Sequence, residues 1–212
     1  MKVTVYSSKG GVGKTPIATN FALDRSFAIG TNEPYNVLSS LIPESRLICV
    51  DDDEPFPLIP DHIDMVFDLA GSIAKKSASI ISALKQSDVV IVPISNEIKS
   101  LVSGVNTILE VAAYTQSIIV VATKLEKQQK EVFSSWVESK DYLNIKKMVD
   151  AKVPFDVPVV PLKLSKVFDV IFEKEMSIRE LTESGGLSAY HYKEISKQFN
   201  DIYDSVGAYQ RG

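Results

Sequence analysis

The chain has 212 residues, of which 45% are hydrophobic and 24% charged, and its net charge is −4. This balance is typical of a soluble globular protein, and the acidic net charge does not favour DNA or acidic membranes unless a local basic patch is present. The single cysteine, Cys49, excludes a disulfide framework or an all-cysteine metal site within one chain, and we expect it to be a small core residue.

The N-terminal stretch MKVTVYSS alternates like a strand and lacks the apolar region of a signal peptide. The longest apolar runs, such as VVIVPI, are far shorter than the roughly 20 residues that span a bilayer. We therefore expect a cytoplasmic protein.

Short apolar runs alternate with longer helical patterns along the chain, which is typical of βαβ units and a parallel sheet. DVVIVPI and SIIVVAT are apolar on both faces, as strands buried inside a parallel sheet should be. The pattern predicts strands near Lys2–Ser7, Ser26–Gly30, Arg46–Val50, Ile63–Asp68, Asp88–Ile94, Ser117–Thr123 and Val157–Pro161.

Three stretches have apolar residues at helical spacing: SASIISALKQS, NEIKSLVSGVNTILEVAAYTQ and roughly Leu187–Val206. The last of them presents Tyr192, Ile195, Phe199, Ile202, Tyr203 and Val206. The chain shows no linker, low-complexity segment or repeat, so the sequence predicts a single domain over residues 1–212.

The stretch SSKGGVGKTP, from Ser7 to Pro16, follows the first predicted strand and precedes a helix. The usual pattern G-x-x-x-x-G-K-[ST] does not fit, because its first glycine would fall at Ser8, whereas K-G-G-x-G-K-T does fit. The three glycines let backbone N–H groups surround a polyphosphate at a helix N-terminus. Lys14 would reach the β- and γ-phosphates, and the Thr15 hydroxyl would complete a Mg²⁺ shell.

The motif KGGVGKT resembles the deviant Walker A motif of the ParA/MinD group of ATPases. The resemblance implies an α/β, three-layer P-loop fold, with a mainly parallel twisted sheet of about seven strands and helices on both faces. It also implies ATP and Mg²⁺ as ligands and a sandwich dimer. In that dimer Lys9 would reach the partner's nucleotide, as an arginine finger does. The implied nucleotide contacts are Lys9, Gly10, Gly11, Val12, Gly13, Lys14, Thr15 and Pro16.

Further segments extend the resemblance over essentially the whole chain. IDMVFDLAGSI looks like the Walker B strand, in which Asp68 would hold Mg²⁺ through water and act with Lys9 and Lys14 in catalysis, while Gly71 would free the loop that senses the γ-phosphate. SIIVVATKLEK resembles the strand that contacts the base, which makes Thr123 and Lys124 base-site candidates. The end of the chain looks like that of small ParA proteins without an N-terminal DNA-binding domain.

Pro16 departs from the family pattern, which has a second threonine at this position. Proline offers neither a hydroxyl nor an N–H to the α-phosphate, although a first helical turn tolerates it. The expected cost is one charged hydrogen bond, about 1–3 kcal/mol, so nucleotide binding should be weakened rather than abolished.

The family's D-x-D-P-Q motif, whose first Asp helps to organise the attacking water, is also altered. Aligning FAIGTNEPYN with it places Thr31 and Glu33 in the acidic positions, so the first Asp is missing. A rival alignment uses Asp51 and Asp53 of VDDDEP, but its spacing is less suitable. Both alignments stay open here, and the preferred one predicts a slow or inactive ATPase.

The leading hypothesis is a ParA-like partition ATPase. ATP would drive homodimerisation, the dimer would bind non-specific DNA and join the nucleoid, and a ParB-type centromere-binding protein would stimulate slow hydrolysis. Candidate DNA contacts are Lys163, Lys166, Lys174, Arg179, Lys193 and Lys197. The alternative is a MinD-like spatial regulator, although the tip DSVGAYQRG is a poor membrane anchor. A metabolic enzyme of the superfamily and a nucleotide-binding scaffold without turnover also remain open.

Overall fold

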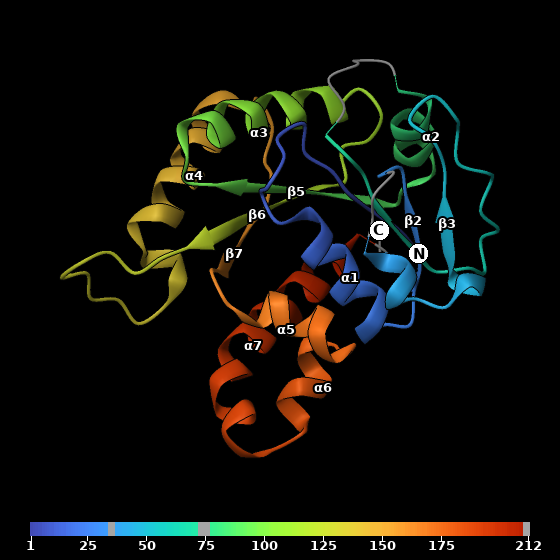
Figure 1. The fold of residues 1–212 in the computed structure, drawn as a ribbon. Coiled ribbons are helices and arrows are strands. Elements are labelled where there is room, and N and C mark those ends of the chain that lie inside the picture. The colour runs from blue at the N-terminus through green and yellow to red at the C-terminus, as the bar shows by residue number, and fades with distance from the viewer. Residues whose placement is uncertain (34–36, 72–76, 210–212) are drawn as a thin grey trace.

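The computed structural model describes residues 1–33, 37–71 and 77–209. Seven strands form one sheet in the order β3-β2-β4-β1-β5-β6-β7, and every neighbouring pair is parallel (Figure 1). This arrangement confirms the predicted fold class. The strands are β1 Lys2–Val5, β2 Ala28–Thr31, β3 Leu47–Cys49, β4 Met65–Asp68, β5 Val89–Ser95, β6 Ile118–Leu125 and β7 Val159–Lys163.

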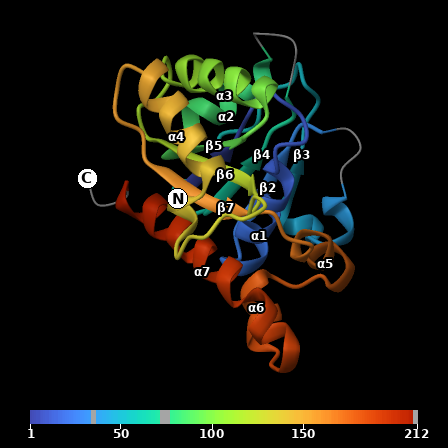
Figure 2. The same cartoon turned by 90° about the vertical axis from the view of Figure 1, so that its left-hand side faces the viewer.

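Helices cover both faces of the sheet, which gives three layers (Figures 1 and 2). One face carries α1 Lys14–Asp24, α5 Val167–Lys174, α6 Ile178–Glu183 and α7 Gly186–Ala208, and the other carries α2 Ala78–Gln86, α3 Ile98–Val111 and α4 Lys140–Lys152. Short 3₁₀ turns are η1 Leu38–Ser40, η2 Glu44–Arg46 and η3 Trp136–Glu138.

The core lies on both sides of the central strands. All seven residues of β5 are buried, as expected for a strand with helices above and below it. The predicted inner face of α7 is largely confirmed, because these side chains are buried: Ile195, Phe199, Ile202, Tyr203 and Val206. The burial fixes α7 and α1 against the same face of the sheet.

Cys49 and part of the apolar surface of α3 are exposed. Cys49 is exposed, so its assignment to the core was wrong; it ends β3, which lies at the edge of the sheet and, among the described strands, pairs only with β2. In α3 the apolar stripe is wider than the face that packs on the sheet, because Ile98 is 81% exposed and Val102 is 49% exposed. The apolar residues of α3 therefore include a second, uncovered face.

Candidate nucleotide-binding site

The phosphate loop joins the end of β1 to the start of α1. Gly11 and Gly13 have φ angles of 73° and 94°, a region that glycine enters without steric cost. Gly13 is also the residue that precedes the helix, and it has no side chain with which to cap the first-turn amides. The N–H groups at this end of α1 are therefore available to an anion. Pro16 occupies the third position of α1 and lacks one such group.

Lys14 and Asp68 bring opposite charges into the interior beside this loop, with exposures of 6% and 1%. Burial lowers the pKa of Lys14, and the positive charge of Lys9 lowers it further. The carboxylates of Asp68 and Glu33 act in the opposite direction and raise this pKa. Burial raises the pKa of Asp68 to about 6; the Thr15 hydroxyl and Lys14 lower it, and Glu33 raises it. All five of these polar groups thus interact at one place.

The donor set at this place fits a hard cation such as Mg²⁺. The Oδ1 atom of Asp68 is buried and has no hydrogen-bond partner within the described residues, and the hydroxyl of Thr15 hydrogen-bonds to the same carboxylate. Carboxylate and hydroxyl oxygens, completed by water and phosphate oxygens, are the ligands that Mg²⁺ prefers. In the described parts of the chain no group of three or more His, Cys, Asp or Glu side chains could hold a metal by itself.

Replacing Asp68 with asparagine should stabilise the ligand-free protein at neutral pH. Because the native pKa is raised from 3.8 to about 6, the native state binds a proton more tightly than the unfolded chain, and the free energy of unfolding falls as pH rises through this window. The D68N variant should therefore gain about 3 kcal/mol at pH 7.5, and the gain should largely vanish near pH 4. Urea unfolding at several pH values measures this, and a variant no more stable than the native chain would contradict it.

The carboxyl ends of β2 and β4 lie next to each other, and Thr31 pairs with Asp68 in the register. Glu33 follows, with its backbone N–H donating to the Thr31 hydroxyl at 3.1 Å, and its charge acts on both Lys14 and Asp68. Asp51 and Asp53 instead follow the edge strand β3 and are exposed. This placement favours Thr31 and Glu33 as the acidic-motif positions, whereas Pro34 of that motif lies outside the described residues.

Gly71 holds the loop after Asp68 close to the phosphate loop. A Cβ atom at this position would lie 2.8 Å from the Ser8 carbonyl oxygen and 3.1 Å from that of Ser7. Only glycine fits such a close backbone approach. The structure thus assigns Gly71 a packing contact, whereas the following loop, which Gly71 was expected to free, lies in residues 72–76, outside the described residues.

Lys9 is half-buried at the start of the loop, and its Nζ atom donates to the Gly10 carbonyl at 2.9 Å. The preceding residue ties the loop to α3: the Ser8 N–H donates to Thr107 Oγ1 at 3.2 Å, and the Ser8 hydroxyl bonds to that of Ser103 at 2.7 Å. The loop therefore contacts the helix whose outer face exposes apolar residues.

A cavity of about 210 Å³ adjoins the phosphate loop where β6 and β7 end. Thr123 and Lys124, the predicted base-site residues, line it together with Gly13 and Pro16, and the Thr123 hydroxyl donates to the Val12 carbonyl at 2.9 Å. The sequence reading missed its other walls, which are Leu162, Leu164, Ser165, Phe168 and Asp169. These residues lie at or just after the end of β7, which pairs with β6. Because neighbouring parallel strands end at the same edge of a sheet, the predicted end of that strand could have indicated them.

The parallel sheet, the glycine loop at an uncapped helix start and the buried lysine–carboxylate pair define a P-loop nucleotide-binding fold. No protein-family model matches the chain, and no curated protein matches its sequence.

Solved structures share the fold over nearly the whole chain. McdA from Cyanothece is similar in its apo form (TM-score 0.68, 14% identity, 97% of this chain and 98% of that chain). A McdA variant with an aspartate changed to alanine, in complex with ATP, is also similar (TM-score 0.61, 15% identity, 97% of this chain and 96% of that chain). Similarity also extends to a plasmid partition protein from Borrelia burgdorferi bound to AMPPNP (TM-score 0.55, 14% identity, 95% of this chain and 98% of that chain). MinD from Aquifex aeolicus has the same TM-score of 0.55, with 12% identity over 96% of this chain and 97% of that chain. The chain therefore has the fold of the ParA/MinD group of P-loop ATPases.

Proposed function

We propose that this protein is an ATPase of the ParA/MinD type that acts as a ParA-like partition protein. The observation that carries the proposal is the phosphate loop, in which Lys14 lies among Asp68, Glu33 and a second lysine, Lys9. Lys14, Thr15 and the loop amides would hold the triphosphate, and the Thr123 cavity would take the base. Mg²⁺ would be held by Thr15 and, through water, by Asp68; bound there, it would neutralise charge on the β- and γ-phosphates.

Hydrolysis is accelerated by a side chain that orients a water molecule near the γ-phosphate, and a carboxylate can also accept its proton. Glu33 is the best candidate, because its charge already acts on Lys14 and Asp68. With Thr31 in place of the other acidic residue, turnover should be slow. A partner of the ParB type would then accelerate hydrolysis.

Dimerisation through the nucleotide is the second part of the proposal. The outer face of α3 exposes Ile98, Val102 and Leu109, and the inner part of the same helix bonds to Ser8. An apolar face joined to the phosphate loop suits a contact that forms when ATP is bound. Lys9 would complete the partner's site.

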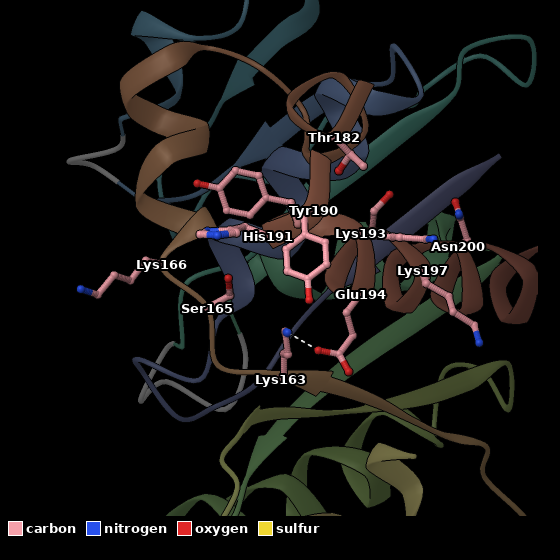
Figure 3. Close-up of a pocket in the computed structure, with 12 residues that line it drawn as sticks. Lys163, Ser165, Lys166, Thr182, Tyr190, His191, Lys193, Glu194, Lys197 and Asn200 are labelled. Atoms are coloured by element: carbon pink, nitrogen blue, oxygen red, sulfur yellow. Dashed lines mark hydrogen bonds and ion pairs between the residues drawn. The ribbon is translucent and has the colours of Figure 1, made fainter. Parts of the chain in front are cut away.

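A groove of about 1130 Å³ supports the proposed DNA contact. It runs along α7 toward the end of β7 and the start of α5, and Lys166, Lys193 and Lys197 line it (Figure 3). Glu194 also lines it, but this carboxylate is paired with Lys163 and accepts from the Trp136 indole at 2.9 Å. The groove therefore presents a net positive charge to a phosphate backbone. Two other candidate contacts, Lys174 and Arg179, are not among its lining residues.

Changing Lys166, Lys193 and Lys197 together to alanine should weaken DNA binding by 10- to 100-fold at low salt. Each lysine that no longer neutralises a phosphate makes the slope of log affinity against log salt less steep by about 0.9. We therefore expect the steepness of that slope to decrease by roughly 2–3 per subunit. A matched control is the triple alanine variant at Lys140, Lys147 and Lys152, which are exposed on α4 across the sheet. Fluorescence anisotropy in the presence of ATP and Mg²⁺ measures both, and an equally weakened affinity in the two variants would count against the groove.

No helix in the described residues is both long and apolar enough to cross a membrane. The tip DSVGAYQRG, judged a poor membrane anchor, extends into residues 210–212, which lie outside the described part of the chain.

Molar mass by light scattering tests the proposed function directly. With ATP and Mg²⁺ the native chain should change from monomer to dimer, and with ADP it should stay monomeric. A mass that ignores the nucleotide, together with no ATP hydrolysis, would overturn the proposal.

A further inference from the structure

Asn32 lies between Thr31 and Glu33 and is only 3% exposed. Its Nδ2 atom donates to Asp52 Oδ1 at 3.0 Å and to the Ser79 hydroxyl at 2.9 Å. Its Oδ1 atom accepts from the Ala70 N–H at 2.7 Å. One side-chain amide therefore joins the end of β2 to the loop after β3, the first turn of α2 and the loop after β4.

Hydroxyl groups at the start of α2 complete this cluster. The Ser77 hydroxyl donates to Asp52 Oδ1 at 2.7 Å and lies 2.7 Å from the Ser79 hydroxyl. We call Asn32, Asp52, Ala70, Ser77 and Ser79 the Asn32 network. Asn32, Ser77 and Ser79 are buried, whereas Asp52 is exposed and Ala70 is partly buried. An unmatched donor or acceptor on the three buried side chains would cost free energy.

The Asn32 network reaches the phosphate loop through Gly71. The Ala70 N–H is held by Asn32, and the next residue, Gly71, packs against the carbonyl oxygens of Ser7 and Ser8. Ser8 in turn bonds to Thr107 of α3. A continuous series of contacts thus runs from α2, past the loop after Asp68, to the start of the phosphate loop and to α3.

We propose that Asn32 is a positioning residue of this site. Its amide fixes the loop after Asp68 against the phosphate loop and connects that loop to the first turn of α2. The proposal rests on the proposed ATPase function, because its main effect is on hydrolysis. A misplacement of about 1 Å near a reacting centre can lower a rate by about 100-fold. The phosphate loop and Lys14, which would bind the nucleotide, are left unchanged.

The test exchanges the amide of Asn32 and the carboxylate of Asp52 between the two positions. In Asn32→Asp a carboxylate faces Asp52 across the present 3.0 Å contact, and the donor is lost. We expect kcat to fall at least 10-fold, with KM within about 3-fold of native. Adding Asp52→Asn returns a donor to the pair, and kcat should recover to within about 3-fold of native. A double variant that regains its melting temperature but not its kcat would overturn the proposal.

Ser82→Ala is the control for a merely structural role. Ser82 also lies on α2, and its hydroxyl accepts from the Phe56 N–H at 2.8 Å and donates to the Ser79 backbone carbonyl at 2.9 Å. Removing this hydroxyl leaves the side-chain groups of the Asn32 network in place. This variant should lose stability but keep kcat, and an equal fall in kcat would contradict a special role for Asn32.

Failure of the ATPase proposal can be told apart from failure of this one. If the native chain binds and hydrolyses no ATP, the proposed function is wrong, and hydrogen exchange at the Ala70 amide then decides the role of Asn32. Asn32→Leu, which removes the acceptor, should raise that exchange rate at least 10-fold above the rate in Ser82→Ala. Equal exchange in the two variants would overturn the proposal.

Discussion

Replacing Lys9 with alanine should abolish the ATP-dependent dimer and reduce hydrolysis by about 10³- to 10⁵-fold, as loss of a trans-acting cation does in related phosphoryl transfer. The lysine lies at the start of the loop, close enough to Lys14 for its charge to lower the pKa of that group. ATP binding to the monomer should change far less, because Lys14 and the loop amides remain. Light scattering and a phosphate-release assay measure the two effects.

Lys152→Ala provides the matched control, since this lysine is exposed at the end of α4 on the other side of the sheet. It should dimerise and hydrolyse ATP as the native chain does. If Lys9→Ala still forms a dimer with ATP, Lys9 does not act across the interface, and the sandwich arrangement loses its chemical basis.

Replacing Glu33 with glutamine should lower hydrolysis by about 10²- to 10³-fold while leaving ATP-driven dimerisation intact. Glutamine keeps the size of the side chain but cannot accept a proton from water. Loss of the negative charge should also bring the pKa of Asp68 below its present value of about 6, because Glu33 raises it. Single-turnover hydrolysis combined with light scattering separates chemistry from assembly.

The double variant Asp51→Asn/Asp53→Asn tests the rival position of the acidic motif. Both residues are exposed after the edge strand β3, so we expect hydrolysis within about 2-fold of native. The opposite result, a slow double variant and a normal Glu33→Gln, would place the working carboxylate in the Asp51–Glu54 loop.

Much of the fold could be predicted because its signals are local. Strands buried on both faces, such as β5 and β6, are continuous apolar runs, and the glycine loop is a short contiguous motif. α4 was not predicted, because its sequence KDYLNIKKMVDAK is mostly polar and buries only Asp141, Tyr142, Ile145 and Val149. Its position depends on packing against the sheet rather than on a strong apolar period.

The sequence indicated the phosphate loop, Asp68 and two residues of the proposed base cavity, Thr123 and Lys124, but neither the other walls of that cavity nor the Asn32 network. Residues 9–16 are contiguous, whereas the base cavity and the Asn32 network join residues far apart in the chain. Asn32 and Ala70 are separated by 38 positions, and Thr123 and Val12 by 111. A single sequence contains no sign of such pairs, because they arise from the order of strands in the sheet. Cys49 shows the same limit: an apolar run does not reveal which strand will lie at the edge.

The exposed position of Cys49 makes the native chain ready for spectroscopic labelling. It is the chain's single cysteine, so a maleimide dye or nitroxide would attach at one defined point on β3 without any engineered change. Two labels in a dimer would report the separation of the two sheet edges by pulsed electron paramagnetic resonance. The assembly could then be followed through its nucleotide cycle, by distance rather than by mass.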